Sequence, residues 1–187
     1  MNNKHIIEHI REQFLNHGAQ LPFTIISIVL FGSYAQEHHT EHSDIDLLVI
    51  AEGINPVFHK RVKEIVTIKK IFSLGILLNI IIMTQNECID NFCNHNPLFL
   101  DIAVSGIVIV DTGCFLQSLI DETLHYINIH NLQNSIDGWK FPVNYQKETF
   151  LSSISNKDFA YAMLADGKRN YTVNPDWKEK LFMNSLN

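Results

Sequence analysis

Apolar residues at helical spacing mark the first seventeen positions of the chain. The stripe consists of Ile6, Ile7, Ile10, Phe14 and Leu15. Gly18 follows it, and glycine is common just after the last residue of a helix. The pattern predicts an amphipathic helix over residues 2–17 that turns this stripe toward a core.

Four later segments are dense in β-branched and other apolar residues, which is typical of buried strands. The first of them, FTIISIVLF, breaks off at Gly32-Ser33, and the second begins with two aspartates separated by one isoleucine. The strands are predicted over residues 23–31, 44–50, 76–84 and 107–110.

Helical spacing returns between and after these strands. Helices are predicted over residues 56–72, 86–94, 97–104 and 114–129. In the first of these, Pro56 takes a first-turn position that tolerates proline. Its inner stripe is predicted to consist of Val57, Val62, Ile65, Ile68, Ile71 and Phe72.

The composition is that of an ordinary globular chain. Of the 187 residues, 46% are hydrophobic and 18% are charged, so the chain can bury a core and does not resemble a disordered protein. The longest apolar run, residues 76–83, is much shorter than the about 20 residues of a membrane-spanning helix. We therefore expect a buried strand there and no membrane partner.

Cysteine usage bears on the compartment. Cys88, Cys93 and Cys114 cannot all pair, and the first residues lack the features of a signal peptide. These observations predict a cytoplasmic protein in which Cys88 and Cys93 are buried free thiols.

Charge is distributed unevenly along the chain. The net charge of −6 argues against general nucleic-acid binding, which needs a basic surface. Residues 60–70 are nonetheless basic, and no lysine or arginine occurs from 71 to 139. This segment is either a solvated helix face or a helix that faces phosphate groups.

The segment LFGSYAQEHHTEHSDIDLLVI, residues 30–50, combines two patterns that carry chemistry. Side chains two apart on a strand share a face, so Asp44 and Asp46 place two carboxylates side by side while Ile45 and Leu47 face the core. Such a pair repels unless a cation lies between its members. Oxygen ligands suit Mg²⁺ or Mn²⁺, which also take substrate phosphates as ligands.

The other pattern is the break after the first strand. Gly32 allows close approach of the backbone to an anion, and Ser33 begins a helical turn whose N–H groups and hydroxyl suit phosphate oxygens. The histidines between the two patterns, His38, His39 and His42, are interpreted as solvated loop residues rather than metal ligands.

Together these residues resemble the DNA polymerase β-like nucleotidyltransferase superfamily, especially the minimal nucleotidyltransferases associated with HEPN domains. The resemblance is close over residues 31–49 and looser through the third strand and residues 96–111. It implies an α/β (α+β) fold with a mixed sheet flanked by helices. It also implies that ATP binds at Gly32, Ser33 and Ser43, and that Asp44 and Asp46 hold Mg²⁺ (or Mn²⁺) for nucleotidyl transfer.

Two positions depart from the family pattern. Family members commonly carry Arg-Gly after the Gly-Ser-x-Ala run, whereas Gln36 and Glu37 follow Ala35 here. The third strand usually supplies a further carboxylate that activates the acceptor hydroxyl, and Asn79 takes that position in the best register. Asn79 is interpreted either as a weak metal ligand or as a strand residue bonded to a loop, and reduced activity is expected.

Three functions are compatible with these residues. The favoured one is transfer of AMP from ATP to a hydroxyl of a protein or small molecule, with the chain as the antitoxin of a toxin–antitoxin pair. A catalytically lapsed nucleotidyltransferase fold that serves as a binding module is the alternative, and an aminoglycoside-type transferase is the third.

The domain organisation is predicted from the loss of apolar periodicity after about residue 131. Residues 1–112 form the nucleotidyltransferase domain, and residues 113–187 form a small, mainly helical C-terminal extension. Within that extension, residues 161–173 resemble the opening helix of a HEPN domain. The extension is interpreted as a truncated or vestigial start of such a domain, and a separate HEPN protein as the partner.

Overall fold

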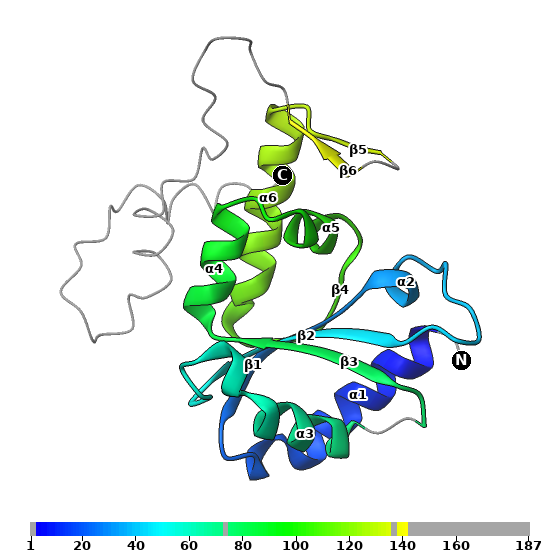
Figure 1. Cartoon of the computed structure of the whole chain (residues 1–187), viewed down its shortest axis with the longest axis vertical. Helices are drawn as coiled ribbons and strands as arrows, with labels where there is room; N and C mark the ends of the chain where they lie inside the picture. The colour runs from blue at the N-terminus through cyan, green and yellow to red at the C-terminus, as the bar shows by residue number, and fades with distance from the viewer. Residues whose placement is uncertain (1–2, 73–74, 136–137, 142–187) are drawn as a thin grey trace, which may run out of the picture.

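A four-stranded sheet forms the centre of the computed structural model, which describes residues 3–72, 75–135 and 138–141 (Figure 1). The strands are β1 (Thr24–Phe31), β2 (Ile45–Glu52), β3 (Leu78–Met83) and β4 (Ile107–Asp111). Their order is β3-β2-β1-β4. β1 is antiparallel to β2 and β4, whereas β2 and β3 are parallel. The sheet is therefore mixed, and the α/β fold class is confirmed.

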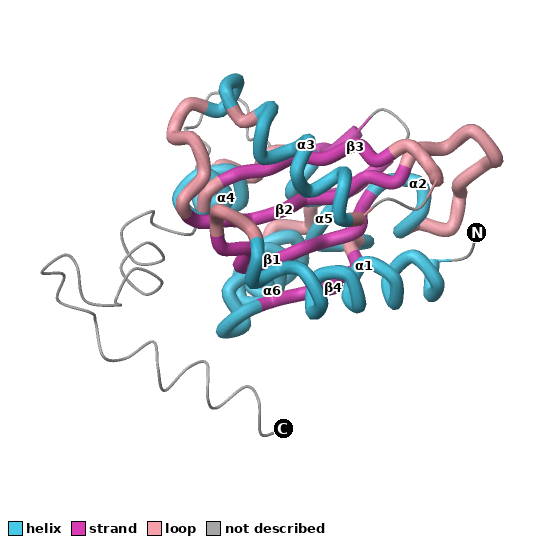
Figure 2. The backbone as a smooth tube through the Cα atoms, turned by 90° about the horizontal axis from the view of Figure 1, so that it is seen from below, coloured by secondary structure: helices cyan, strands magenta, loops and turns pink. Residues whose placement is uncertain are grey.

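Helices cover both faces of this sheet. On one face lie α1 (Asn3–His17) and α3 (Val62–Ile71), which pass in front of the strands in Figure 2. On the other lie α4 (Gln85–Cys93), α5 (Pro97–Ser105) and α6 (Phe115–Ile129). A single turn, α2 (Gly32–Ala35), continues from β1, and a small hairpin of β5 (Gln133–Ser135) and β6 (Gly138–Lys140) follows α6.

Alternation along the strands builds two cores. Leu30 and Leu47 pack on the side of α1 and α3, whereas Val29 and Leu48 pack on the side of α4, α5 and α6. Because β1 and β2 are covered on both faces, their sequences are nearly continuous apolar runs instead of alternating ones.

The predicted elements are found with one clear error. The helix predicted over 56–72 begins only at Val62, after a single 3-10 turn at Phe58–Lys60. Val57 and Val62, assigned to its inner stripe, are exposed, and so is Leu15 of α1. The other predicted helices and strands differ from α1, α4, α5, α6 and the four strands by two residues or fewer at each end.

A buried arginine explains the late start of α3. Arg61 is 1% exposed, and its guanidinium donates two hydrogen bonds to the Glu87 carboxylate, at 2.6 and 2.8 Å. It also donates to the carbonyl oxygens of Asn55, Pro56 and Ile82. The carbonyl oxygens of residues 55 and 56 thus accept hydrogen bonds from a side chain. In a helix that began at residue 56, they would instead accept backbone hydrogen bonds from the next turn. The two interpretations of the basic segment, a solvated helix face or a phosphate-facing helix, therefore both fail for Arg61.

The same ion pair organises the start of α4. The Thr84 side chain accepts a hydrogen bond from the Glu87 backbone, and the Glu87 carboxylate accepts one from the Thr84 backbone, which is a capping box. The hydrogen bonds from Arg61 hold the pKa of Glu87 below its ordinary value. One arginine therefore ties the β2–α3 connection, β3 and α4 together.

The cysteines agree with the expectation of free thiols. Cys88 and Cys93 are buried and unpaired, and Cys114 is unpaired and exposed. Burial raises the pKa of Cys93 to about 11 and raises that of Cys88 further. Among the helices in the described part of the chain, none is long and apolar enough to cross a membrane.

The C-terminal extension is described only at its beginning. α6 packs into the core beside α4 and α5 through Phe115, Leu116, Leu119 and Ile120. The Trp139 indole and the Asn134 amide of the hairpin both donate hydrogen bonds to Asp101 of α5. Residues 161–173 lie outside the described residues, so the division at residue 112 and the HEPN interpretation remain predictions.

A stack of rings closes the end of α6. His95 is 2% exposed and stacks on Tyr126 at 3.8 Å between ring centroids, and His130 lies 4.3 Å from Tyr126 on the same measure. Neither ring nitrogen of His95 has a hydrogen-bond partner among the described residues. Burial, with a smaller contribution from His130, lowers the pKa of His95 from 6.5 to about 4.

This shift predicts a pH dependence of stability. Because the folded pKa is lowered, the unfolded chain takes up a proton first as pH falls below 6.5, and stability declines until His95 itself protonates near pH 4. Between pH 6.5 and 4, the contribution of His95 to the free energy of unfolding falls by up to about 3 kcal/mol. In urea unfolding between pH 7 and 4, the free energy of unfolding of His95→Phe should decline by that much less than that of the wild type. Equal declines would contradict the lowered pKa of His95.

Candidate active site

The end of β1 brings the chain back sharply toward β2. Gly32 has a φ of +69°, the left-handed region that favours glycine. A Cβ at this position would overlap the Oδ2 atom of Asp46. The backbone of the Gly-Ser turn and the Asp46 carboxylate are therefore in direct contact, as the two halves of the sequence pattern had suggested.

Strand register places Asp46 between the other two strands of the site. Asp46 is paired with Phe31 of β1 on one side and with Asn79 of β3 on the other. The Asn79 Nδ2 atom donates a hydrogen bond of 2.8 Å to Asp46 Oδ1. One carboxylate thus touches the Gly32 turn with one oxygen and the Asn79 amide with the other.

Asn79 lies outside the core. It is exposed, whereas its neighbours Leu78 and Ile80 are buried on the side of α1 and α3. The predicted register, with Asn79 on the face of Asp46, is confirmed by this contact. The amide presents its nitrogen to Asp46, and the role of Asn79 as a weak metal ligand stays a prediction.

The loop before β2 is organised by short-range hydrogen bonds. The Ser43 hydroxyl accepts a hydrogen bond from the Thr40 backbone at 2.8 Å, and the Ser43 backbone donates to the Thr40 carbonyl at 3.1 Å. Asp44 follows, exposed, immediately before the first residue of β2. In this arrangement Ser43 shapes the turn that presents Asp44, and its nucleotide-binding role stays a prediction.

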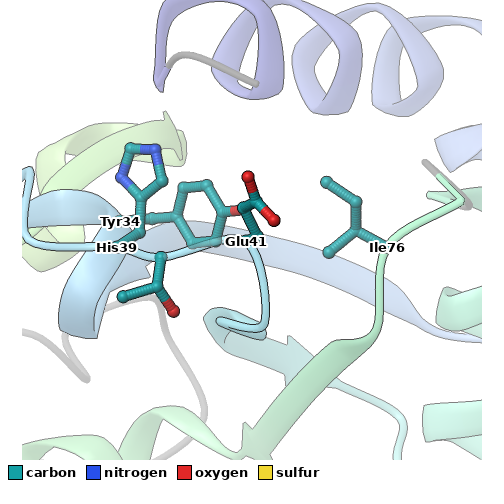
Figure 3. Close-up of a pocket in the computed structure, with 5 residues that line it drawn as sticks. Tyr34, His39, Glu41 and Ile76 are labelled. Carbon is teal, nitrogen blue, oxygen red and sulfur yellow. The ribbon is translucent and has the colours of Figure 1, made fainter.

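A cavity missed by the sequence reasoning lies beside this loop. It has a volume of about 600 Å³ and is lined by Tyr34, His39, Thr40, Glu41 and Ile76 (Figure 3). The rings of Tyr34 and His39 stack in parallel, 4.1 Å apart. His39 is therefore part of a cavity wall and is not simply solvated. The clustering of histidines near the Gly-Ser turn was the only sequence signal for it.

Residues 7–105, more than half of the chain, match the model of the nucleotidyltransferase domain family. The chain belongs to this family. It is a nucleotidyltransferase, and the site just described lies within the matched residues.

A relative supports the same assignment. A protein of Methanocaldococcus jannaschii, named "putative protein adenylyltransferase", is 31% identical over 120 residues, which are 62% of this chain and 80% of the relative. Two solved structures, a toxin–antitoxin with AMP-PNP and a mutant of the toxin–antitoxin MntA–HpeT, align with a TM-score of 0.38 at 16% and 17% identity. They cover 67% and 70% of this chain, which covers 90% and 91% of them. A TM-score that low carries no inference about this nucleotidyltransferase.

The two departures from the family pattern have structural consequences. Glu37 has a φ of +59°, a left-handed conformation that suits the glycine common in this family. Gln36, at the position of the family's arginine, donates a hydrogen bond of 3.3 Å to Ser105 of α5. In this nucleotidyltransferase the turn after Ser33 thus contacts α5 through a neutral amide and has no arginine of its own.

The metal ligands predicted from the sequence would all bind through oxygen atoms. Asp46 lies against the Gly32 turn and Asn79, and Asp44 is exposed just before β2; the metal-binding roles of these three side chains stay predictions. In the described ranges, no cluster of three histidine, cysteine, aspartate or glutamate side chains could hold a metal by itself. Any metal ion held by the two aspartates would therefore need further ligands from a bound molecule such as a phosphate.

The Gly32–Asp46 contact can be tested with a matched pair of variants. Gly113 has almost the same φ, +68°, but a Cβ there would meet nothing within 4 Å. Gly113→Ala should cost about 1 kcal/mol from backbone strain alone. Gly32→Ala should cost about 1 kcal/mol more, because the Asp46 carboxylate must turn away and lose its Asn79 bond.

Urea unfolding measures the two losses, and the NMR signals of the Asn79 side-chain amide report the hydrogen bond. Those signals should shift in Gly32→Ala and not in Gly113→Ala. Equal stability losses together with unshifted amide signals would contradict the contact.

Proposed function

We propose that the chain is a Mg²⁺-dependent adenylyltransferase that transfers AMP from ATP to a hydroxyl group. The observation that carries this is the convergence at Asp46: its carboxylate touches the Gly32 turn on one side and Asn79 on the other, in a chain of the nucleotidyltransferase family. Asp44 lies two residues ahead, exposed at the entry to the same strand.

The residues present fit a magnesium ion that arrives with a nucleotide. Gly32 lacks the Cβ that would overlap Asp46 Oδ2, so the turn lies against this carboxylate without displacing it. Mg²⁺ commonly takes one or two carboxylates and completes its shell with substrate phosphates and water, which suits two aspartates without a third. When bound, the ion would neutralise charge on the attacking and leaving oxygens.

The chain's own residues would bind and orient the nucleotide. Gly32 lets the backbone approach a phosphate, and the Ser33 hydroxyl supplies a hydrogen-bond donor beside it. Residues 12–59 contain no lysine or arginine, so no such side chain of this segment competes with a metal for the phosphates. Asn79 would hold the Asp46 carboxylate in one orientation through its 2.8 Å hydrogen bond.

One observation favours a second candidate function. Asn79 cannot accept the proton of an acceptor hydroxyl, and its amide already satisfies one oxygen of Asp46 without a metal. A lapsed nucleotidyltransferase that binds nucleotide or a partner without turnover would need no more than this. An adenylyltransferase with reduced turnover would be intermediate between the active enzyme and the lapsed module.

The acceptor and partner belong to the proposal as well. A protein hydroxyl is the acceptor we favour over a small molecule, in line with the name of the M. jannaschii relative. We further propose that the chain acts in the cytoplasm as the antitoxin of a toxin–antitoxin pair with a HEPN protein as partner. This last part rests on the sequence resemblance of residues 31–49.

Replacing either aspartate tests the proposed site. Asp46→Asn and Asp44→Asn should weaken Mg·ATP binding in titration calorimetry by more than the about tenfold typical of losing an outer-shell partner of a metal ligand. Glu52→Gln is the matched control, since Glu52 is an exposed acid at the other end of β2. Unchanged affinity in both aspartate variants would refute the site, whereas label transferred from ATP to any protein of a lysate would exclude the lapsed alternative.

Asn79→Asp separates the two candidate functions. A carboxylate 2.8 Å from Asp46 would repel it, so the variant should be less stable without metal and should gain more in Tm from Mg²⁺ than the wild type does. Any transfer activity should rise by about 10²-fold, because a carboxylate can act as a base. A loss of stability that Mg²⁺ does not reverse, with no gain in turnover, would support the lapsed module.

A further inference from the structure

The cavity beside the Gly-Ser turn has a one-sided charge. Among the described residues that line it, Glu41 carries the only carboxylate and there is no lysine or arginine; no described residue forms an ion pair or hydrogen bond with this exposed carboxylate. The nearest cations along the chain are Arg11 and Lys60, and Lys4 on α1 pairs with Glu8 at 3.9 Å. Residues 12–59 carry six acids and no lysine or arginine. An unpaired carboxylate thus lies on a cavity wall in an acidic segment.

The other walls are flat or apolar. Tyr34 and His39 form a parallel ring stack, and Ile76 lies across the cavity from His39 (Figure 3). The buried Nδ1 atom of His39 has no hydrogen-bond partner among the described residues. Aromatic rings and aliphatic groups beside a carboxylate are the surroundings in which proteins hold guanidinium and ammonium groups, whose alkyl stems pack against apolar walls.

The cavity is joined to the proposed catalytic site by the chain itself. Tyr34 directly follows Ser33, and Glu41 stands three residues before Asp44. The carbonyl of Tyr34 also accepts a hydrogen bond from Asn3, so the start of α1 secures this wall. A group held in the cavity would therefore lie against the loop that connects the Gly-Ser turn to the aspartates.

We propose that this cavity binds a cationic side chain, arginine or lysine, of the protein that accepts the nucleotidyl group. The Glu41 carboxylate receives the charged hydrogen bonds, and the Tyr34–His39 stack and Ile76 flank the rest of the side chain. A volume of about 600 Å³ lies within the range of sites that bind small ligands and side chains. That the bound molecule is the acceptor rests on the proposed function, whereas binding of a cation does not.

The test uses the full chain and two matched probes, acetyl-arginine amide and its uncharged isostere acetyl-citrulline amide. In NMR titrations of the labelled protein, the arginine probe should shift signals of the cavity residues and bind about tenfold more tightly than the citrulline probe. Glu41→Gln should abolish that preference. Glu37→Gln is the control, because it removes the same charge from the same loop at a residue that does not line the cavity.

Three outcomes would overturn cation binding: no shifts at the cavity residues, equal affinity for the two probes, or an equal effect of Glu37→Gln and Glu41→Gln. The last would mean that general surface charge, and not the cavity, attracts the probe.

A second titration in saturating Mg·ATP tests the acceptor assignment. An acceptor and a nucleotide must be bound together, so the arginine probe should bind with the same or higher affinity. Displacement of the probe would show that the cavity takes part of the nucleotide and would overturn the assignment. Failure of the proposed function is seen separately, as absence of Mg·ATP shifts at Gly32, Ser33 and Asp46, whatever the probe does.

Discussion

Everything at the candidate site depends on the register of three strands. The pairing of Phe31 with Asp46 and of Asp46 with Asn79 sets one carboxylate between a glycine turn and an amide. A shift of one residue in β2 would turn Asp46 into the core and Ile45 and Leu47 out of it. Since both faces of β2 are buried beyond Asp46, the hydrophobic cores on either side hold this register.

Arg61 holds the parallel half of the sheet in a comparable way. Parallel strands need a crossover connection, and here that connection starts with an irregular segment and a 3-10 turn before α3. The guanidinium binds carbonyl oxygens at residues 55, 56 and 82 and the carboxylate that caps α4. Removing one partner of a buried ion pair is strongly destabilising, so this residue is part of the framework that positions β3 and Asn79.

The lack of lysine and arginine around the candidate site bears on the proposed binding of nucleotide and acceptor. Residues 12–59 carry no lysine or arginine, and Gln36 stands where the family commonly has an arginine. Phosphate charge would therefore be met by backbone N–H groups and by a metal ion rather than by side-chain cations. The same deficit of cations leaves Glu41 unpaired on the cavity wall. An anionic nucleotide and a cationic acceptor group would thus be recognised by adjacent parts of one loop.

The sequence by itself determined the mixed order of helices and strands and the candidate residues Gly32, Asp44, Asp46 and Asn79, because apolar periodicity and a spaced polar motif are local signals. It misplaced the start of α3 and did not predict the cavity. The burial of Arg61 depends on Glu87, 26 residues away, and the cavity depends on Ile76 meeting residues 34–41. Only the tertiary structure decided these features, since contacts between residues far apart in the chain leave no periodic trace in it.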